Sequence, residues 1–245
     1  LGKFNSLYES MDPKTYETAR YTLNDGSYWP KTTDNFWQDH NILSAAWDIN
    51  ENLKTTLSLH YTYGYGYYDE FRPDNKVSKF GFDMVKSNGK PVSDFVRQKG
   101  LSRNAAGVVY NISYNNNGWD VIGGLSGQMF WGNHFGYLTY VSNPDVVNHY
   151  PVLAGLNDTD FNNGRYTYYD SDARKDDYSA FAKASKQFGE HFTVFADLQY
   201  RHVRYTTDGI NDKFVKQSDG TYENQRLDIN ETYNFFNPKV GVSYK

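Results

Sequence analysis

One stretch of the chain alternates so strictly, and for so long, that few folds can accommodate it. Residues 52–71 read NLKTTLSLHYTYGYGYYDEF. From Leu53 to Tyr67, every second residue is leucine or tyrosine with a single threonine, and the residues between them are mostly polar or glycine. Alternation with a period of two indicates a β-strand that has one apolar face and one hydrated face.

The length of this strand is as informative as its pattern. Strands of globular proteins usually have roughly 5–6 residues, whereas this run continues for 20 residues. A tilted strand in an outer membrane needs about 9–11 residues to cross the hydrocarbon core. The leucines at one end of the apolar face and the tyrosines at the other fit a lipid-facing band followed by an aromatic girdle. The stretch therefore predicts a strand of a transmembrane β-barrel.

The composition is compatible with such a barrel and excludes several other classes. Among 245 residues, 18% are aromatic, the net charge is −4 and cysteine is absent. The mean hydropathy is −0.79, and no apolar run is long enough for a transmembrane helix. Barrel strands still read as polar overall, because only one face contacts lipid. The negative charge argues against nucleic acid as a partner, and the lack of cysteine excludes disulfides and thiolate metal sites.

The same alternation recurs along the chain and predicts seven strands. Besides 52–71, the predicted strands cover residues 39–49, 101–114, 119–141, 178–188, 192–200 and 233–244. Their connections alternate between tight polar turns and long polar loops, the latter at 72–100, 142–175 and 206–231. Short turns at one end and long loops at the other are typical of an outer-membrane barrel with periplasmic turns and extracellular loops. A soluble β-sandwich would have shorter strands and more even connections.

The predicted fold is therefore all-β, a segment of a large antiparallel transmembrane β-barrel. We expect one partial barrel domain over 1–245, with a long extracellular loop at 1–37 and barrel strands and loops at 38–245. Seven strands cannot close a barrel without leaving unpaired backbone in lipid, and single-chain bacterial barrels have even strand numbers. The first residues also lack the features of a signal peptide. Both observations predict that the chain is part of a longer exported protein.

Several strand sequences resemble a known family. They are YTYGYGYYDEF, GLSRNAAGVVYNISY, GGLSGQMFWGNHFGYL, FADLQYRHVRY and YNFFNPKVGVSY. From about residue 35 to the end, the chain resembles the barrel of TonB-dependent outer-membrane receptors of the Bacteroidetes type. The resemblance implies a barrel of about 22 strands, together with an N-terminal plug and a TonB box that contacts an energising inner-membrane complex. Neither the plug nor the TonB box is found in this sequence.

The resemblance also implies a function, the binding and import of a scarce nutrient across the outer membrane. Family substrates include iron siderophores, haem, cobalamin and glycans. Because the chain does not closely match the longer glycan importers, an iron-siderophore or other metal complex is favoured. Outer-membrane lipid and the TonB complex would be partners, and a surface lipoprotein partner stays open. The alternative hypothesis is a soluble, aromatic-rich β module that binds glycans at the cell surface.

Two sets of residues are candidates for ligand binding. Aromatic side chains in the predicted loops could stack on a flat ligand, although such rings also commonly pack on loop backbone. This set comprises Tyr28, Trp29, Trp37, Tyr166, Tyr168 and Tyr169. Polar side chains on the lumen face could line a ligand path, although any large barrel has a hydrated interior. This set comprises His60, Asp120, Gln128, His134, Lys183, Asp197, Gln199 and Arg201.

Other chemistries find no support in the sequence. The six histidines show no ligand spacing, so we predict no metal site and no cofactor. The Asp- and Asn-rich stretch 157–176 does not match a calcium-loop motif. No glycine pattern frames a serine as a nucleophile, and we predict that the protein is not an enzyme.

Overall fold

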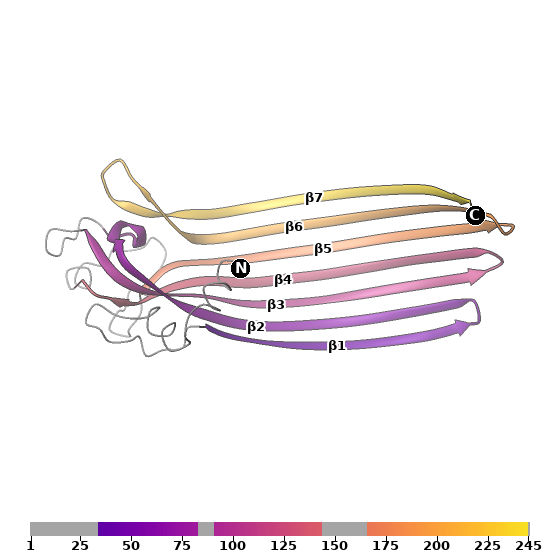
Figure 1. Cartoon of the computed structure of the whole chain (residues 1–245), viewed down its shortest axis with the longest axis horizontal. Coiled ribbons are helices and arrows are strands. Elements are labelled where there is room, and N and C mark those ends of the chain that lie inside the picture. The colour runs from indigo at the N-terminus through magenta and orange to yellow at the C-terminus, as the bar shows by residue number, and fades with distance from the viewer. Residues whose placement is uncertain (1–33, 83–90, 144–165, 245) are drawn as a thin grey trace, which may run out of the picture.

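The computed structural model describes residues 34–82, 91–143 and 166–244. These residues form one antiparallel sheet of seven strands, in which every strand pairs with its neighbour in the sequence (Figure 1). The strands are β1 (Asp34–Asn50), β2 (Leu53–Lys76), β3 (Val92–Asn116), β4 (Trp119–Val141), β5 (Tyr166–Phe188), β6 (Phe192–Lys216) and β7 (Tyr222–Tyr244). A 3-10 helix, η1 (Val77–Phe80), follows β2. No helix among the described residues is long and apolar enough to cross a membrane.

Three tight turns lie at one end of the sheet, as the sequence predicts (Figure 1). In the first turn, the Asn50 side-chain oxygen accepts hydrogen bonds from the backbone N–H groups of Asn52 and Leu53, both at 2.9 Å. In the second, Asn117 and Gly118 both have positive φ, 49° and 73°. Positive φ at two successive residues matches the twist of a two-residue hairpin. We call this the turn end and the opposite end the loop end.

The strands extend farther toward the loop end than the sequence predicts. β3 begins at Val92 and β5 at Tyr166, while β6 continues to Lys216. The predicted loops at 72–100, 142–175 and 206–231 are therefore too long, and β6 and β7 are joined by only residues 217–221. Likewise, β1 starts at Asp34, so 34–37 belong to the barrel wall and not to an N-terminal loop. In these extensions apolar and polar residues no longer alternate regularly, although the backbone pairing continues.

The strand register keeps the two faces separate across the whole sheet. One row of register partners is Ala45, Leu57, Tyr110, Leu125, Ala180, Tyr200 and Phe236. The adjacent row is Ser44, Ser58, Val109, Ser126, Ser179, Arg201 and Phe235. Hydroxyl pairs in this second row lie at 2.9 Å and 2.8 Å. We call the first side the leucine face and the second the serine face.

The leucine face carries an exposed apolar band near the turn end. Leu125 is 59% exposed and Val240 is 78% exposed. On β5 to β7 the band ends at the row that contains Tyr178, beyond which Asp176, Arg204 and Thr232 are polar. On β2 and β4, exposed Tyr61, Met129 and Trp131 continue the apolar side chains beyond this row. Leaving so much apolar surface in water would cost about 25 cal/mol for each Å². The band is therefore suited to a lipid environment.

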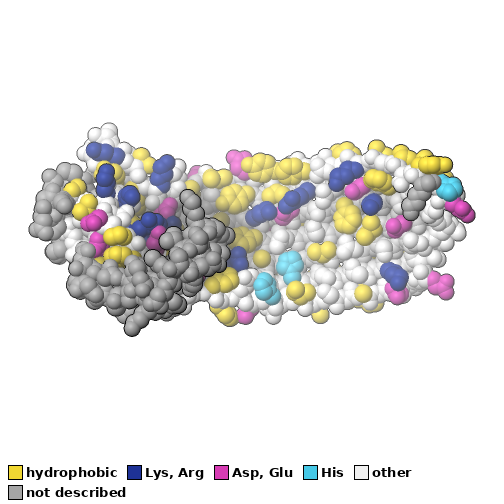
Figure 2. All heavy atoms as spheres, viewed as in Figure 1, with side chains coloured by type: hydrophobic (Ala, Val, Ile, Leu, Met, Phe, Trp, Pro, Cys, Tyr) yellow, Lys and Arg dark blue, Asp and Glu magenta, His cyan; other side chains and the backbone are white. Residues whose placement is uncertain are grey.

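A small core covers the serine face at the loop end. Phe80 of η1 packs on Phe95 and Tyr168, with ring centroids 4.5 Å and 5.3 Å apart. Phe82 packs on Tyr166 at 5.2 Å, and Leu138 is the register partner of Tyr166. The connection after β2 thus folds over three other strands. Elsewhere, charged and histidine side chains lie along the strands of the face drawn in Figure 2.

Candidate functional site

The structure places the predicted aromatic residues differently from the sequence analysis. Tyr28 and Trp29 lie outside the described residues. Trp37 lies in β1 and not in a loop; it is 55% exposed on the leucine face, and its ring packs edge-on against Tyr63 at 5.4 Å. The expectation that Trp37 belongs to a loop is wrong, because the backbone ladder already begins at Asp34.

The loop prediction is also wrong for Tyr166 and Tyr168. Both lie in β5 and are 0% exposed, because the aromatic core closes over them. The Tyr168 hydroxyl has no hydrogen-bond partner among the described residues. Neither ring can stack on a ligand from solvent, so any contribution to binding would be made by supporting the wall beneath it.

The predicted lumen residues do lie together on the serine face, but they do not converge on one site. The His60 ring covers Gly107, where a Cβ atom would overlap with it. Arg201 donates two hydrogen bonds to Asp177, at 2.9 Å and 2.5 Å. His134 lies in register with Gly66, which is six residues beyond His60 on β2, or about 20 Å along the strand.

A hollow at the loop end of the serine face brings several polar and aromatic groups together. Its volume is about 230 Å³, and its lining includes Phe36, Tyr68, Lys99, His134 and Tyr169. Of these, His134 and Tyr169 are among the candidates predicted from the sequence. Phe36 and Lys99 are not among them, because both fall in segments predicted as loops.

Two glycines leave space for two of the aromatic rings that line this hollow. A Cβ atom at Gly136 would overlap with the Tyr169 ring, and one at Gly66 would lie 2.6 Å from the Phe36 ring. Each ring therefore lies flat against the backbone of a neighbouring strand, in a place that only glycine leaves open. A glycine opposite an aromatic residue could have served as a sequence signal for this packing.

Among the described residues that line the hollow, one cation, Lys99, is held in a defined place. The Lys99 ammonium group forms an ion pair with Asp212 at 2.7 Å and lies 5.6 Å from the centre of the Tyr169 ring. Nearby, Arg97 and Arg72 both pair with Glu70, each at 2.7 Å. Each of these positive charges is thus positioned by a carboxylate, which lies on the same strand for Arg72, on the neighbouring strand for Arg97 and on β6 for Lys99.

The two phenols beside these charges remain protonated at neutral pH. Burial raises the pKa of Tyr168, and the nearby Arg97 only partly opposes this shift. Burial, and then the charge of Asp212, raise the pKa of Tyr169. Both residues lie beyond the apolar band, and protonated phenols donate hydrogen bonds. Among the described residues, no group of three His, Asp or Glu side chains is arranged to hold a metal ion.

Comparisons with known proteins identify the fold. No protein-family model matches the sequence, and no curated protein sequence matches it either. Two solved structures of the ferric-catecholate import receptor Fiu from E. coli K12 do match. The open form has a TM-score of 0.58 at 12% identity, covering 91% of this chain and 35% of the receptor. The closed form has a TM-score of 0.57 at 13% identity, covering 91% and 33%.

The chain folds as part of an outer-membrane β-barrel. This confirms the predicted all-β barrel class, including the long antiparallel strands. The chain spans about a third of the length of the receptors that it matches. At this identity the likeness concerns the fold alone.

Proposed function

We propose that this chain is a barrel segment of a TonB-dependent outer-membrane receptor that binds and imports an iron-siderophore or a related metal complex. The observation that carries the proposal is the combination of a lipid-type apolar band on one face with a cation- and phenol-lined hollow on the other. In a closed barrel, the leucine face would contact lipid and the serine face would line the lumen. The receptors with the same fold are named for importing ferric catecholates.

The hollow suits an anionic, aromatic chelate. The Lys99 ammonium supplies positive charge, the Phe36 and Tyr169 rings supply flat apolar surface, and the neutral Tyr169 phenol and His134 supply hydrogen-bonding groups. An ammonium group has three N–H donors, so Lys99 can donate to a ligand while it keeps its pair with Asp212. Charge-assisted hydrogen bonds are stronger than neutral ones, which favours anionic over neutral chelates. The phenols, being protonated, are poor competitors for the iron itself, so the complex would bind intact. The protein would act by binding and transport and not as an enzyme.

The remaining parts of the mechanism concern the whole protein. We propose that an N-terminal plug gates the lumen and contacts the TonB complex. The assignment to the Bacteroidetes type rests on the strand sequences quoted above. Haem, cobalamin and glycans remain other ligand classes for the same architecture, and a surface lipoprotein remains a possible partner.

Equilibrium binding to the full-length protein in detergent tests the proposal. The probe is a ferric tris-catecholate complex, whose binding quenches tryptophan fluorescence, and a neutral ferric hydroxamate, haem and cobalamin serve as comparison ligands. Replacing Lys99 with glutamine should weaken catecholate binding about tenfold, roughly 1.4 kcal/mol, and should affect the hydroxamate less. Lys183→Gln is the matched control, since Lys183 lies on the same face beside Phe195, far from the hollow.

Specific outcomes would contradict the proposal. If the wild-type protein binds none of the iron complexes, the import of iron chelates is wrong. If it binds haem or cobalamin with higher affinity than the iron chelates, the transport function stands but the ligand class changes. The alternative of a soluble glycan-binding module gains no support from the barrel fold, and it would require tight glycan binding in detergent-free buffer.

A further inference from the structure

We propose that the leucine face carries, directly beyond the apolar band, a groove that binds a saccharide chain of the surrounding outer-leaflet lipid. The inference rests on the proposed function only for the outer-membrane location. It concerns the outside of the barrel wall and is independent of the hollow on the serine face.

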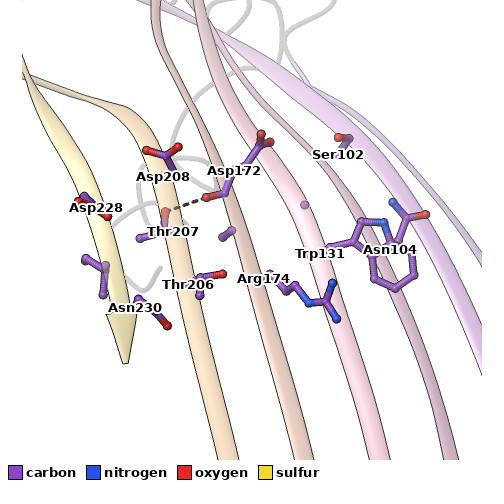
Figure 3. A pocket seen from close by; sticks show the side chains of 13 residues that line it. Ser102, Asn104, Trp131, Asp172, Arg174, Thr206, Thr207, Asp208, Asp228 and Asn230 are labelled. Atoms are coloured by element: carbon purple, nitrogen blue, oxygen red, sulfur yellow. Dashed lines mark hydrogen bonds between the residues drawn. The ribbon is translucent and has the colours of Figure 1, made fainter. Parts of the chain in front are cut away.

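The groove spans five strands. Its volume is about 560 Å³, within the range of ~300–1,000 Å³ that is typical of small-molecule sites. Figure 3 shows side chains from β3 to β7 around it. Those that carry the argument are Asn104, Trp131, Arg174, Thr206, Asp208 and Asp228.

The register fixes where the groove lies. Asn104, Trp131, Arg174 and Thr206 are successive register partners. Arg174 precedes Tyr178, the last row of the apolar band, by four residues on β5, which is about 13 Å along the strand. These four side chains lie on the leucine face. In an outer membrane these side chains would therefore project into the layer of lipid headgroups, outside the barrel.

The groove combines an aromatic platform with oxygen and nitrogen hydrogen-bonding groups. Trp131 is 40% exposed, so its ring can pack against the apolar side of a sugar. The Asn104 amide both donates and accepts hydrogen bonds, and Asp208 and Asp228 accept them from hydroxyl groups. Few ligands other than saccharides offer a weakly apolar ring face edged with hydroxyl donors.

The charge of the groove selects a neutral saccharide over a phosphate. Asp172, Asp208 and Asp228 are register partners on β5, β6 and β7, and like charges directly opposite each other are unfavourable. Arg174, the single cation among the described residues that line the groove, already donates two hydrogen bonds to Asp176, at 3.0 Å and 3.1 Å. A phosphate would meet uncompensated carboxylates here, whereas sugar hydroxyls would satisfy them.

The test uses the full-length protein in detergent and a defined probe. The probe is the lipid-free oligosaccharide released from the lipopolysaccharide of the bacterium that makes the protein. Saturation-transfer NMR detects binding through the sugar protons, and titration gives the affinity.

Trp131→Ala and Asp208→Asn should each weaken binding about tenfold or more. Trp47→Ala is the matched control, because Trp47 is an exposed tryptophan on the same face within the apolar band. Heat-modified migration on gels verifies that each variant is folded.

The outcomes separate this inference from the proposed function. Sugar binding that is unaffected by Trp131→Ala would overturn the inference, as would binding that occurs only with added calcium, since the carboxylates would then form a cation site. A wild-type protein that binds ferric catecholate but not the oligosaccharide would overturn the inference and leave the proposed function intact. Oligosaccharide binding with loss in Trp131→Ala, without any chelate binding, would support the groove while the proposed function fails.

Discussion

At the scale of single residues, Gly136 determines where one wall of the hollow lies. Its missing side chain leaves the space that the Tyr169 ring occupies, and the ring in turn forms one wall beside Lys99. Because the ring is packed between the sheet and Tyr168, whose ring lies 5.0 Å away, it cannot move aside without disturbing the aromatic core. The shape of the site thus depends on a residue that contributes no functional group.

Replacing Gly136 with alanine should therefore displace Tyr169 and weaken ferric-catecholate binding about tenfold or more. The measurement is fluorescence-quenching titration of the full-length protein. Gly123→Ala is the control, because the nearest atom to a new Cβ atom there lies 3.6 Å away, an ordinary contact. Unchanged affinity in Gly136→Ala would show that the Tyr169 wall is not part of the binding site.

Tyr169 also predicts a dependence of stability on alkaline pH. Burial and Asp212 raise its pKa in the folded protein, whereas an unfolded tyrosine titrates near ~10. The neutral form is favoured by folding, so its stabilising contribution is complete below pH ~10 and is lost as the pH rises above that value. Tyr169→Phe should reduce the fall of the unfolding midpoint between pH ~9 and ~11. If the unfolding midpoint of the variant and of the wild type depends on pH in the same way, the raised pKa of Tyr169 would be contradicted.

At the scale of elements, each strand has two functionally different halves. The turn-end half alternates because only its leucine face carries the apolar band. The loop-end half does not alternate, because the aromatic core covers part of its serine face and its leucine face is polar on β5 to β7. β4 (Trp119–Val141) matches its predicted bounds in full, whereas β5 begins twelve residues before its predicted start at Tyr178. The segment DARKDD in β5 has no apolar period, so its strand conformation depends on pairing with β4 and β6.

The same difference explains what could be predicted of the candidate site. His134 lies on a strand that was predicted correctly, and its position on the serine face follows from the alternation. Lys99 and Phe36 lie in loop-end halves that read as loops, so no local pattern joins them to His134. Tyr168 was misplaced for a related reason, since a polar and aromatic segment does not reveal whether a distant connection such as η1 will cover it.

Replacing Leu125 with arginine tests the assignment of the two faces of β4. Leu125 faces outward within the apolar band, so the substitution should lower the free energy of unfolding by about 2–4 kcal/mol in lipid vesicles. Gln128→Arg is the matched control on the serine face of the same strand, and we expect a cost of less than about 1 kcal/mol. Equal costs for both variants would contradict a lipid-facing leucine face.

At the scale of the whole molecule, the exposed apolar band predicts that the protein needs lipid or detergent around it. The full-length protein should be extracted from membranes only by detergent and should aggregate when detergent is removed, because water cannot solvate the band. Size-exclusion chromatography with light scattering measures both effects. A monodisperse species in plain buffer would contradict the proposed membrane location and would favour the alternative of a soluble glycan-binding module.

The unequal halves of the strands have a mechanical consequence. On β5, the apolar band ends at Tyr178, and Tyr169 in the wall of the hollow precedes it by nine residues, or about 30 Å along the strand. This stretch of wall acts as a rigid spacer, and a bilayer that is a few Å thicker or thinner is accommodated at the band alone. Chelate affinity should therefore be the same in vesicles of short-chain and long-chain lipid. A receptor of the proposed kind would keep one ligand affinity while the composition of its membrane changes around it.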